Sequence, residues 1–185
     1  MSLQVHTTAT APEKSKEILE KVKSKYGFIP NLMGVFAESP EILQAYLSLS
    51  TLLDQTTLTT TERQIALLAA SSVNNCEYCM AAHSSASSMQ NLPGDVIQAV
   101  RDGSPIADHK LEAFRQFVLA VTEKRGSVSE KEVDAFLEAG YTNRNILEVI
   151  MAVGMKTLSN YTNHISETPL DAAFESAKWK KTAAA

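Results

Sequence analysis

One recurring pattern constrains this fold most: a helix-capping residue is followed by apolar residues three or four positions apart. Period-two alternation, which is typical of strands, does not recur along the sequence. The helix starts predicted in this way are Ser39, Thr59, Pro93, Asp108, Ser129 and Thr142 or Asn143. The predicted ends are Gly103, Gly126, Gly140 and about Ser166, ahead of Pro169. The pattern predicts an all-α fold of about eight or nine helices with short loops.

Two apolar segments bear on the core and on assembly. The segment Ile65–Ala70 is apolar nearly all round and predicts a buried helix. A second apolar stripe at helical spacing runs through residues 146–158. Together they present more apolar surface than one small layer easily covers, so we expect a homo-oligomer. The length of 185 residues fits a single domain spanning 1–185, with a frayed tail over 178–185.

Composition and charge exclude several classes of protein. The net charge of -4 offers no basic surface for nucleic acid. Neither a run long enough to span a membrane nor the charged and apolar regions of a secretory leader occurs in the sequence. We therefore expect a cytoplasmic protein in a reducing compartment, where structural disulfides are disfavoured.

The stretch N-N-C-E-Y-C-M-A-A-H-S-S holds both cysteines of the chain and one of its four histidines. Asn74 and Asn75 are predicted to cap a helix, which would put Cys76 in its first turn. There the positive end of the helix dipole should lower the pKa of a thiol. Cys76 and Cys79 are spaced i, i+3, and Cys79 and His83 are spaced i, i+4, so all three side chains share one helix face.

Four explanations of this motif stay open on the residues alone. The cysteines could form a disulfide staple, bind a metal, pack as buried apolar side chains or work as a redox pair. A zinc site needs a fourth ligand, and His6, His109 and His164 lack ligand spacing. Because the two cysteines can close a small disulfide with little backbone change, a reversible dithiol–disulfide couple is favoured.

The segment Leu58–Ser85 resembles the AhpD-like, carboxymuconolactone decarboxylase family, whose pattern is N-x-C-x-Y-C-x-x-x-H. The flanking stretches F-I-P-N-L-M-G-V-F-A-E-S-P-E and N-Y-T-N-H-I-S-E-T-P-L-D resemble it too, so the likeness runs from about Gly27 to Asp171. It implies an AhpD-like all-α domain that assembles as a trimer or hexamer. It also implies a thiol-dependent peroxidase or disulfide reductase without cofactor or metal. The decarboxylase branch lacks the cysteine pair, so decarboxylation is not expected.

The resemblance implies a role for each motif residue. Cys79 matches the thiol that attacks the peroxide, Cys76 the resolving thiol, and His83 the histidine of a proton relay. Tyr78 stands where some members have a second relay histidine. An external dithiol, either a thioredoxin-like protein or a lipoylated carrier, would reduce the disulfide that forms. The expected function is therefore an antioxidant peroxidase acting on a hydroperoxide.

The chain departs from the family at Gln64, where characterised peroxidases carry a glutamate; Glu62 lies two residues earlier. Since each helical residue turns by about 100°, only one of the two can face the thiols. The family register selects Gln64, and we predict that its missing charge slows the peroxidase, so that Gln64→Glu should be faster. Gln64 could instead only complete a capping box with Thr61, as Glu62 does with Thr59.

Two features carry no assigned chemistry. Asn160 and His164 share one face of the last long helix, and His164 is expected to interact with a helix end. Trp179 is expected to be a packing or subunit-docking residue. The alternative to an enzyme is a redox-sensing scaffold whose cysteines only switch an interface.

Overall fold

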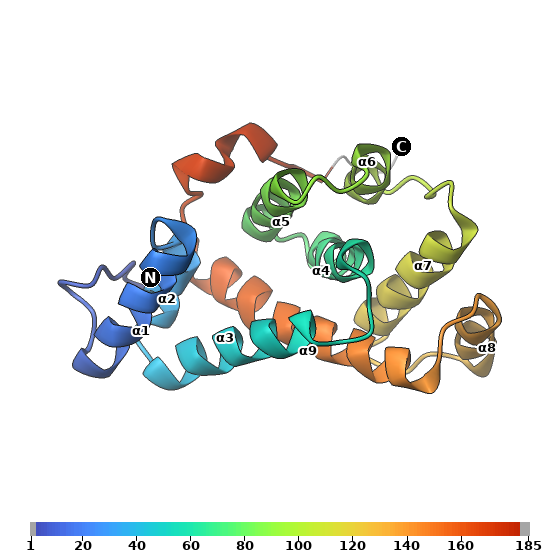
Figure 1. The fold of residues 1–185 in the computed structure, drawn as a ribbon, viewed down its shortest axis with the longest axis horizontal. Helices are drawn as coiled ribbons and strands as arrows, with labels where there is room; N and C mark the ends of the chain where they lie inside the picture. The colour runs from blue at the N-terminus through green and yellow to red at the C-terminus, as the bar shows by residue number, and fades with distance from the viewer. Residues whose placement is uncertain (1–2, 182–185) are drawn as a thin grey trace.

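The computed structural model describes residues 3–181, and every regular element in this range is a helix (Figure 1). The helices are α1 Glu13–Tyr26, α2 Asn31–Phe36, α3 Pro40–Asp54, α4 Thr60–Val73, α5 Glu77–Met89, α6 Gly94–Asp102, α7 His109–Glu123, α8 Glu130–Glu138, α9 Asn143–Ser166 and the 3₁₀ helix η1 Ala172–Ala177. The all-α prediction is confirmed.

Helix α4 lies at the centre and packs against α5, α6, α7 and α9 (Figure 1). Its segment Ile65–Ala70 is buried, with exposed fractions of 0–5%. The prediction of a buried helix is thus confirmed, but the apolar surface of α4 is covered inside the chain. It offers no argument for an oligomer.

Most predicted helix starts are confirmed, and one capping box is not formed. Reciprocal capping boxes join Thr59 to Glu62 and Ser129 to Glu132. Thr142 forms a similar box with the Asn145 side chain, and Asp108 accepts from two backbone N–H groups at the start of α7. The box expected between Thr61 and Gln64 is absent because the N-cap of α4 is Thr59 and not Thr61.

The N-terminal segment packs closely on α2. The backbone N–H of His6 donates to the carbonyl of Gly34 at 3.1 Å. A methyl group on Gly34 would lie 2.7 Å from the carbonyl oxygen of His6 and 2.8 Å from Val5 Cγ1. Only glycine allows the backbones to approach this closely.

The C-terminal segment is held against α5 and α6. The Tyr78 hydroxyl donates to Asp171 Oδ2 at 2.5 Å, and the indole N–H of Trp179 donates to the Arg101 carbonyl at 2.8 Å. Trp179 therefore packs inside its own chain. The fraying expected over 178–185 stays a prediction, and its residues 182–185 lie outside the described part.

The outer face of α9 carries an exposed apolar stripe. Its large side chains are Leu147, Ile150, Tyr161 and Ile165, with exposed fractions of 49–69%. Gly154 lies on the same face and is also exposed. From Leu3 to Lys181, no helix has the length and apolar character needed to cross a bilayer.

Candidate active site

The turn before the motif differs from the expectation. Asn74 is the C-cap of α4, Asn75 has a left-handed φ of 53°, and Cys76 itself is the N-cap of α5. Asparagine tolerates this backbone conformation better than most residues, so the pair ends one helix and does not start the next. Cys79, and not Cys76, therefore lies in the first turn of α5.

Asn160 and His164 hold this turn in place. The Asn74 amide donates to Asn160 Oδ1 at 2.9 Å. The His164 ring is 2.8 Å from the Asn74 carbonyl oxygen, which only accepts, so Nε2 is the donor. The carbonyl belongs to the C-cap of α4, so His164 does contact a helix end, although that of another helix. Both residues position the backbone that leads into Cys76.

The two cysteines are free and buried, with exposed fractions of 1% for Cys76 and 2% for Cys79. The Asn163 side-chain amide donates to Cys79 Sγ at 3.2 Å and to Cys76 Sγ at 3.6 Å. The hydrogen bond that Cys76 gives to Cys79, together with burial, raises the pKa of Cys76. It remains a neutral thiol at pH 7.

Cys79 has the opposite electrostatic character. Burial alone would raise the pKa of its thiol, but the hydrogen bond from Cys76 and the positive charge of Lys156 outweigh burial. Together they hold the pKa of Cys79 well below its usual range. A thiolate is the nucleophilic form of cysteine, and of the two thiols Cys79 is the one that ionises first.

Lys156 reaches the site from α9 and is fully buried, with an exposed fraction of 0%. Its ammonium lies 3.0 Å from Nε2 of His83. Burial alone would lower the pKa of Lys156, but the negative charge of Cys79 raises it. The lysine is therefore held in its charged form by the thiolate beside it.

His83 is partly buried and contacts Lys156. An ammonium has only donors, so Nε2 accepts and the imidazole proton lies on Nδ1. Burial and the charge of Lys156 lower the pKa of His83 well below its usual range, so the ring is neutral at pH 7. In this structure Nε2 accepts from Lys156 and not from Cys79. The expected role of His83 as proton acceptor for Cys79 stays a prediction.

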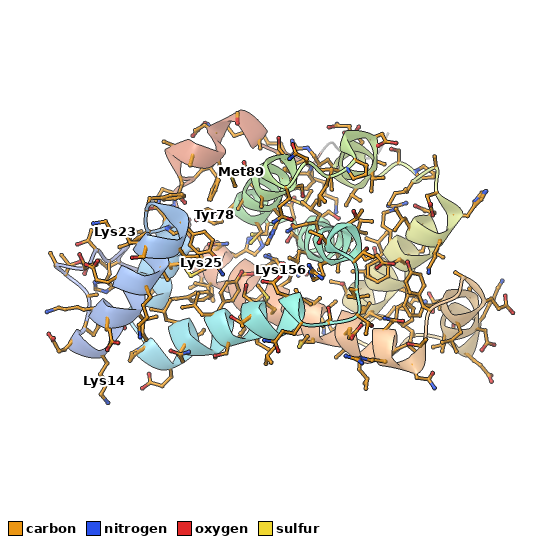
Figure 2. The ribbon with its side chains drawn as sticks, viewed as in Figure 1. Lys14, Lys23, Lys25, Tyr78, Met89 and Lys156 are labelled. Carbon is orange, nitrogen blue, oxygen red and sulfur yellow. The ribbon has the colours of Figure 1, made fainter. Side chains whose placement is uncertain are left out.

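A cavity of about 1020 Å³ lies beside these residues, and Cys79, His83 and Lys156 line it. The wall is formed by α1 to α6, α9 and η1, and much of it is aromatic or aliphatic. Large apolar side chains in the wall are Tyr26, Phe28, Leu32, Met33, Tyr46, Leu53, Leu67, Tyr78, Met89, Met155 and Phe174. Tyr78, Met89 and Lys156 are labelled in Figure 2. The volume is large enough for an organic substrate.

Gln64 and Glu62 have different surroundings. Gln64 lines the cavity and is 9% exposed, and its buried Oε1 has no hydrogen-bond partner among residues 3–181. Glu62 accepts from Tyr141 at 2.8 Å and closes the capping box at the start of α4. The side chain that faces the cavity is therefore Gln64.

Tyr78 lines the cavity but is committed to structural hydrogen bonds. Its hydroxyl donates to Asp171 and accepts from the backbone N–H of Leu32 at 3.3 Å. Burial, and then the bond to Asp171, raise the pKa of Tyr78. The tyrosine thus links α2 and the C-terminal segment to α5.

Sequence reasoning missed Lys156 and Asn163, which contact the motif from α9. A pattern could have found them. Residues Val149, Ala152, Lys156, Asn160 and Asn163 recur every three or four positions and form the buried face of α9. No group of three or more potential His, Cys, Asp or Glu metal ligands occurs in residues 3–181.

Known proteins support this picture of the fold. Residues 40–123 match the sequence model of the Carboxymuconolactone decarboxylase family, which confirms the resemblance seen at the cysteine motif. None of the curated proteins is significantly similar to the sequence.

Three solved structures are similar over most of the chain. An uncharacterized peroxidase-related protein with an alkylhydroperoxidase AhpD core from Ralstonia eutropha JMP134 has a TM-score of 0.79 at 23% identity, covering 92% of each chain. A peroxidase-related protein from Silicibacter sp. TM1040 has a TM-score of 0.79 at 19% identity, covering 94% of this chain and 92% of that one. A variant of the debrominase Bmp8 in complex with 2,3,4-tribromopyrrole has a TM-score of 0.79 at 16% identity, covering 96% of each chain. At these identities the likeness shows the fold alone.

Proposed function

We propose that this chain, which carries a carboxymuconolactone decarboxylase family domain on an AhpD-like helical fold, is a thiol-dependent peroxidase. One observation supports the proposal above others: two free thiols lie one helical turn apart beside a large cavity, and the second has a lowered pKa. A neutral partner thiol next to a stabilised thiolate is the arrangement that a dithiol–disulfide cycle requires.

The cycle begins with the Cys79 thiolate, which attacks the distal oxygen of a hydroperoxide. The O–O bond breaks, the sulfur becomes a sulfenic acid and an alcohol leaves. Cys76 then condenses with the sulfenic acid, which forms the Cys76–Cys79 disulfide and releases water. An external dithiol, either a thioredoxin-like protein or a lipoylated carrier, reduces the disulfide and is oxidised in turn.

The division of labour between the thiols follows from their surroundings. Cys79 contacts Asn163 at 3.2 Å and lines the cavity, whereas Cys76 does not line it. Cys79 is therefore the attacking thiol and Cys76 the resolving one. Stabilisation of the thiolate matters because an ordinary cysteine is only a few per cent ionised at pH 7.

The test is turnover with a chemical dithiol as reductant. Wild-type protein should consume organic hydroperoxide well beyond one equivalent per thiol pair. Cys79→Ser should abolish consumption, while Cys76→Ser should leave a Cys79 sulfenic acid that a trapping reagent captures. If the two serine variants behave alike, the assigned roles are wrong.

A redox-sensing scaffold is the alternative to an enzyme. It would form the same disulfide but would stop after one equivalent of peroxide, even with excess dithiol. Stoichiometric consumption together with a change of oligomeric state would therefore favour the scaffold over the peroxidase.

The cavity supports one further candidate reaction. Its volume of about 1020 Å³ and its aromatic wall suit a halogenated aromatic as well as a hydroperoxide. Thiol-dependent debromination can be tested with 2,3,4-tribromopyrrole, the ligand in the similar Bmp8 structure. Bromide release with a dithiol, in the absence of peroxide turnover, would replace the peroxidase proposal.

A further inference from the structure

We infer that Lys156 is a catalytic residue that acts as counter-ion of the Cys79 thiolate and then as proton donor to the alcohol that leaves the hydroperoxide. The second role rests on the proposed peroxidase function. The first does not, because it concerns the protein without substrate.

The position of Lys156 requires an anion. Its side chain is fully buried, and no carboxylate among residues 3–181 forms an ion pair with it. An isolated buried ammonium is unfavourable by several kcal/mol or more unless it is paired or loses its proton. For Lys156 to keep its proton, a partner of opposite charge must be close to Nζ.

The titratable groups around Lys156 leave one candidate. His83 on α5 is neutral and accepts from the ammonium. On α3, burial raises the pKa of Tyr46, which keeps its hydroxyl neutral at pH 7. Cys76 is also neutral. Cys79 is the remaining group, and it lines the same cavity wall as Lys156.

The same burial makes Lys156 a proton donor at the right moment. While Cys79 is a thiolate, the pair is mutually stabilised. Once the sulfur has accepted oxygen and become a neutral sulfenic acid, the ammonium is buried without a counter-ion, and desolvation then favours its neutral form. A leaving alkoxide is a far stronger base than an amine, so the proton moves to the alkoxide.

Charge and protons balance through the cycle. Thiolate, ammonium and hydroperoxide give sulfenic acid, neutral amine and alcohol. The neutral Lys156 amine next takes the proton of Cys76, and the resulting thiolate attacks the sulfenic sulfur. The departing hydroxide takes that proton from Lys156 and leaves as water. After the external dithiol has reduced the disulfide, the Cys79 thiol returns a proton to Lys156 and restores the pair.

His83 has a positioning role in this scheme. Its Nε2 holds one N–H of Lys156 at 3.0 Å and supplies no charge. The ammonium keeps its other N–H donors for Cys79 and for the substrate oxygen. A charged histidine at this place would repel Lys156, so the neutral form is the functional one.

Two variants separate the two roles. Lys156→Met removes the charge and the proton, whereas Lys156→Arg keeps a charge that is not released in proteins. Lys21→Met, on the exposed face of α1, is the matched control for loss of a lysine. The ultraviolet absorbance of the thiolate is titrated against pH in peroxide-free protein. Lys156→Met should shift the Cys79 titration upwards, while Lys156→Arg and Lys21→Met should leave it near wild type.

The second readout is the dependence of the rate on the leaving group. Rates are compared for hydroperoxides whose alcohols differ in acidity. The wild-type rate should depend weakly on the acidity of the alcohol. The rates of both Lys156 variants should depend on it steeply, because neither variant donates a proton. Loss of general-acid help should slow the poorest leaving group by roughly a hundredfold or more. Rates for Lys156→Arg that match wild type throughout would overturn the proton-donor role.

A stability measurement covers the case in which a single variant folds poorly. Cys79→Ser leaves the buried ammonium without its anion and should lower Tm, and adding Lys156→Met should restore part of the loss. If the two substitutions change Tm additively, the counter-ion role is refuted. An unchanged titration of Cys79 in Lys156→Met would refute it as well. Absence of peroxide turnover in wild type, with the titration shift present, would refute only the proposed function.

Discussion

Gln64 and Glu62 lie two positions apart on α4, and this separation sends their side chains to different places. Gln64 faces the cavity that Cys79, His83 and Lys156 line, while Glu62 is bonded to Tyr141. Helix geometry predicted that only one of the two faces the thiols, and the family resemblance selected Gln64. The effect of a charge at position 64 was not, because it depends on Lys156, which the motif does not contain.

The structure reverses the sign expected for Gln64→Glu. A carboxylate in this cavity would compete with the thiolate for Lys156, and like charges disfavour a second anion. We expect the variant to raise the pKa of Cys79 and to react more slowly with hydroperoxide at pH 7. Stopped-flow rates and thiolate titration test this. Glu62→Gln, the control, should leave the rate unchanged and cost stability. A faster Gln64→Glu enzyme would restore the original expectation.

The neutral His83 ring makes stability depend on pH. Its pKa is lowered in the folded protein from an ordinary value of 6.5. Below about pH 6.5 the unfolded chain therefore binds more protons at this position than the folded one. The stability that the neutral ring contributes is complete above that pH. As the pH falls towards the folded pKa, the free energy of unfolding decreases by up to about 1.4 kcal/mol per pH unit.

Denaturant unfolding between about pH 5 and 7 measures this dependence. His83→Gln should flatten it relative to wild type, while exposed His109→Gln should not. An equal slope in His83→Gln and wild type would mean that folding does not lower the pKa of the ring.

Helix starts were predictable where one capping residue stood alone, as at Asp108, Ser129 and Thr142. The Asn74–Asn75 pair failed because asparagine serves equally as an N-cap and as a residue that ends a helix. Lys156 was missed for a related reason. A single lysine on a long amphipathic helix is usually solvated, and this expectation outweighed the helical spacing that places Lys156 on the same face as Val149 and Ala152.

The contact between α2 and the N-terminal segment depends on the missing side chain of Gly34. Gly34→Ala would push a methyl group against the His6 carbonyl oxygen at 2.7 Å. We expect a loss of about 1–3 kcal/mol in unfolding free energy, as for overpacked sites. Gly94→Ala, where a methyl group meets no atom within 4 Å, should be close to neutral. Equal denaturation midpoints for the two variants would show that the N-terminal segment can detach from α2 with little loss of unfolding free energy.

At the scale of the molecule, the outer stripe of α9 gathers four large exposed apolar side chains on one helix face. Leu147, Ile150, Tyr161 and Ile165 are exposed along it, and Gly154 would allow a partner to approach closely. We propose that this face joins copies of the chain into a trimer or hexamer. The stripe partly overlaps residues 146–158 of the sequence prediction, but the buried segment of α4 does not contribute.

Sedimentation tests the assembly. Wild type should sediment as an oligomer at micromolar concentration, and Ile150→Asp should shift it towards the 20.1 kDa monomer. Met89→Asp, which charges an even more exposed apolar site on α5, should leave the oligomer intact. A monomeric wild type would remove the proposal.

The docking of Trp179 on α6 has an optical consequence. It is the one tryptophan of the sequence, and its indole is held by the carbonyl of Arg101, a residue of the cavity wall. Intrinsic fluorescence therefore reports from a single place, next to the cavity and without a label. Release of the C-terminal segment would expose the indole to water and shift its emission to the red, so each stage of the thiol cycle can be followed for movement of this wall in unmodified protein.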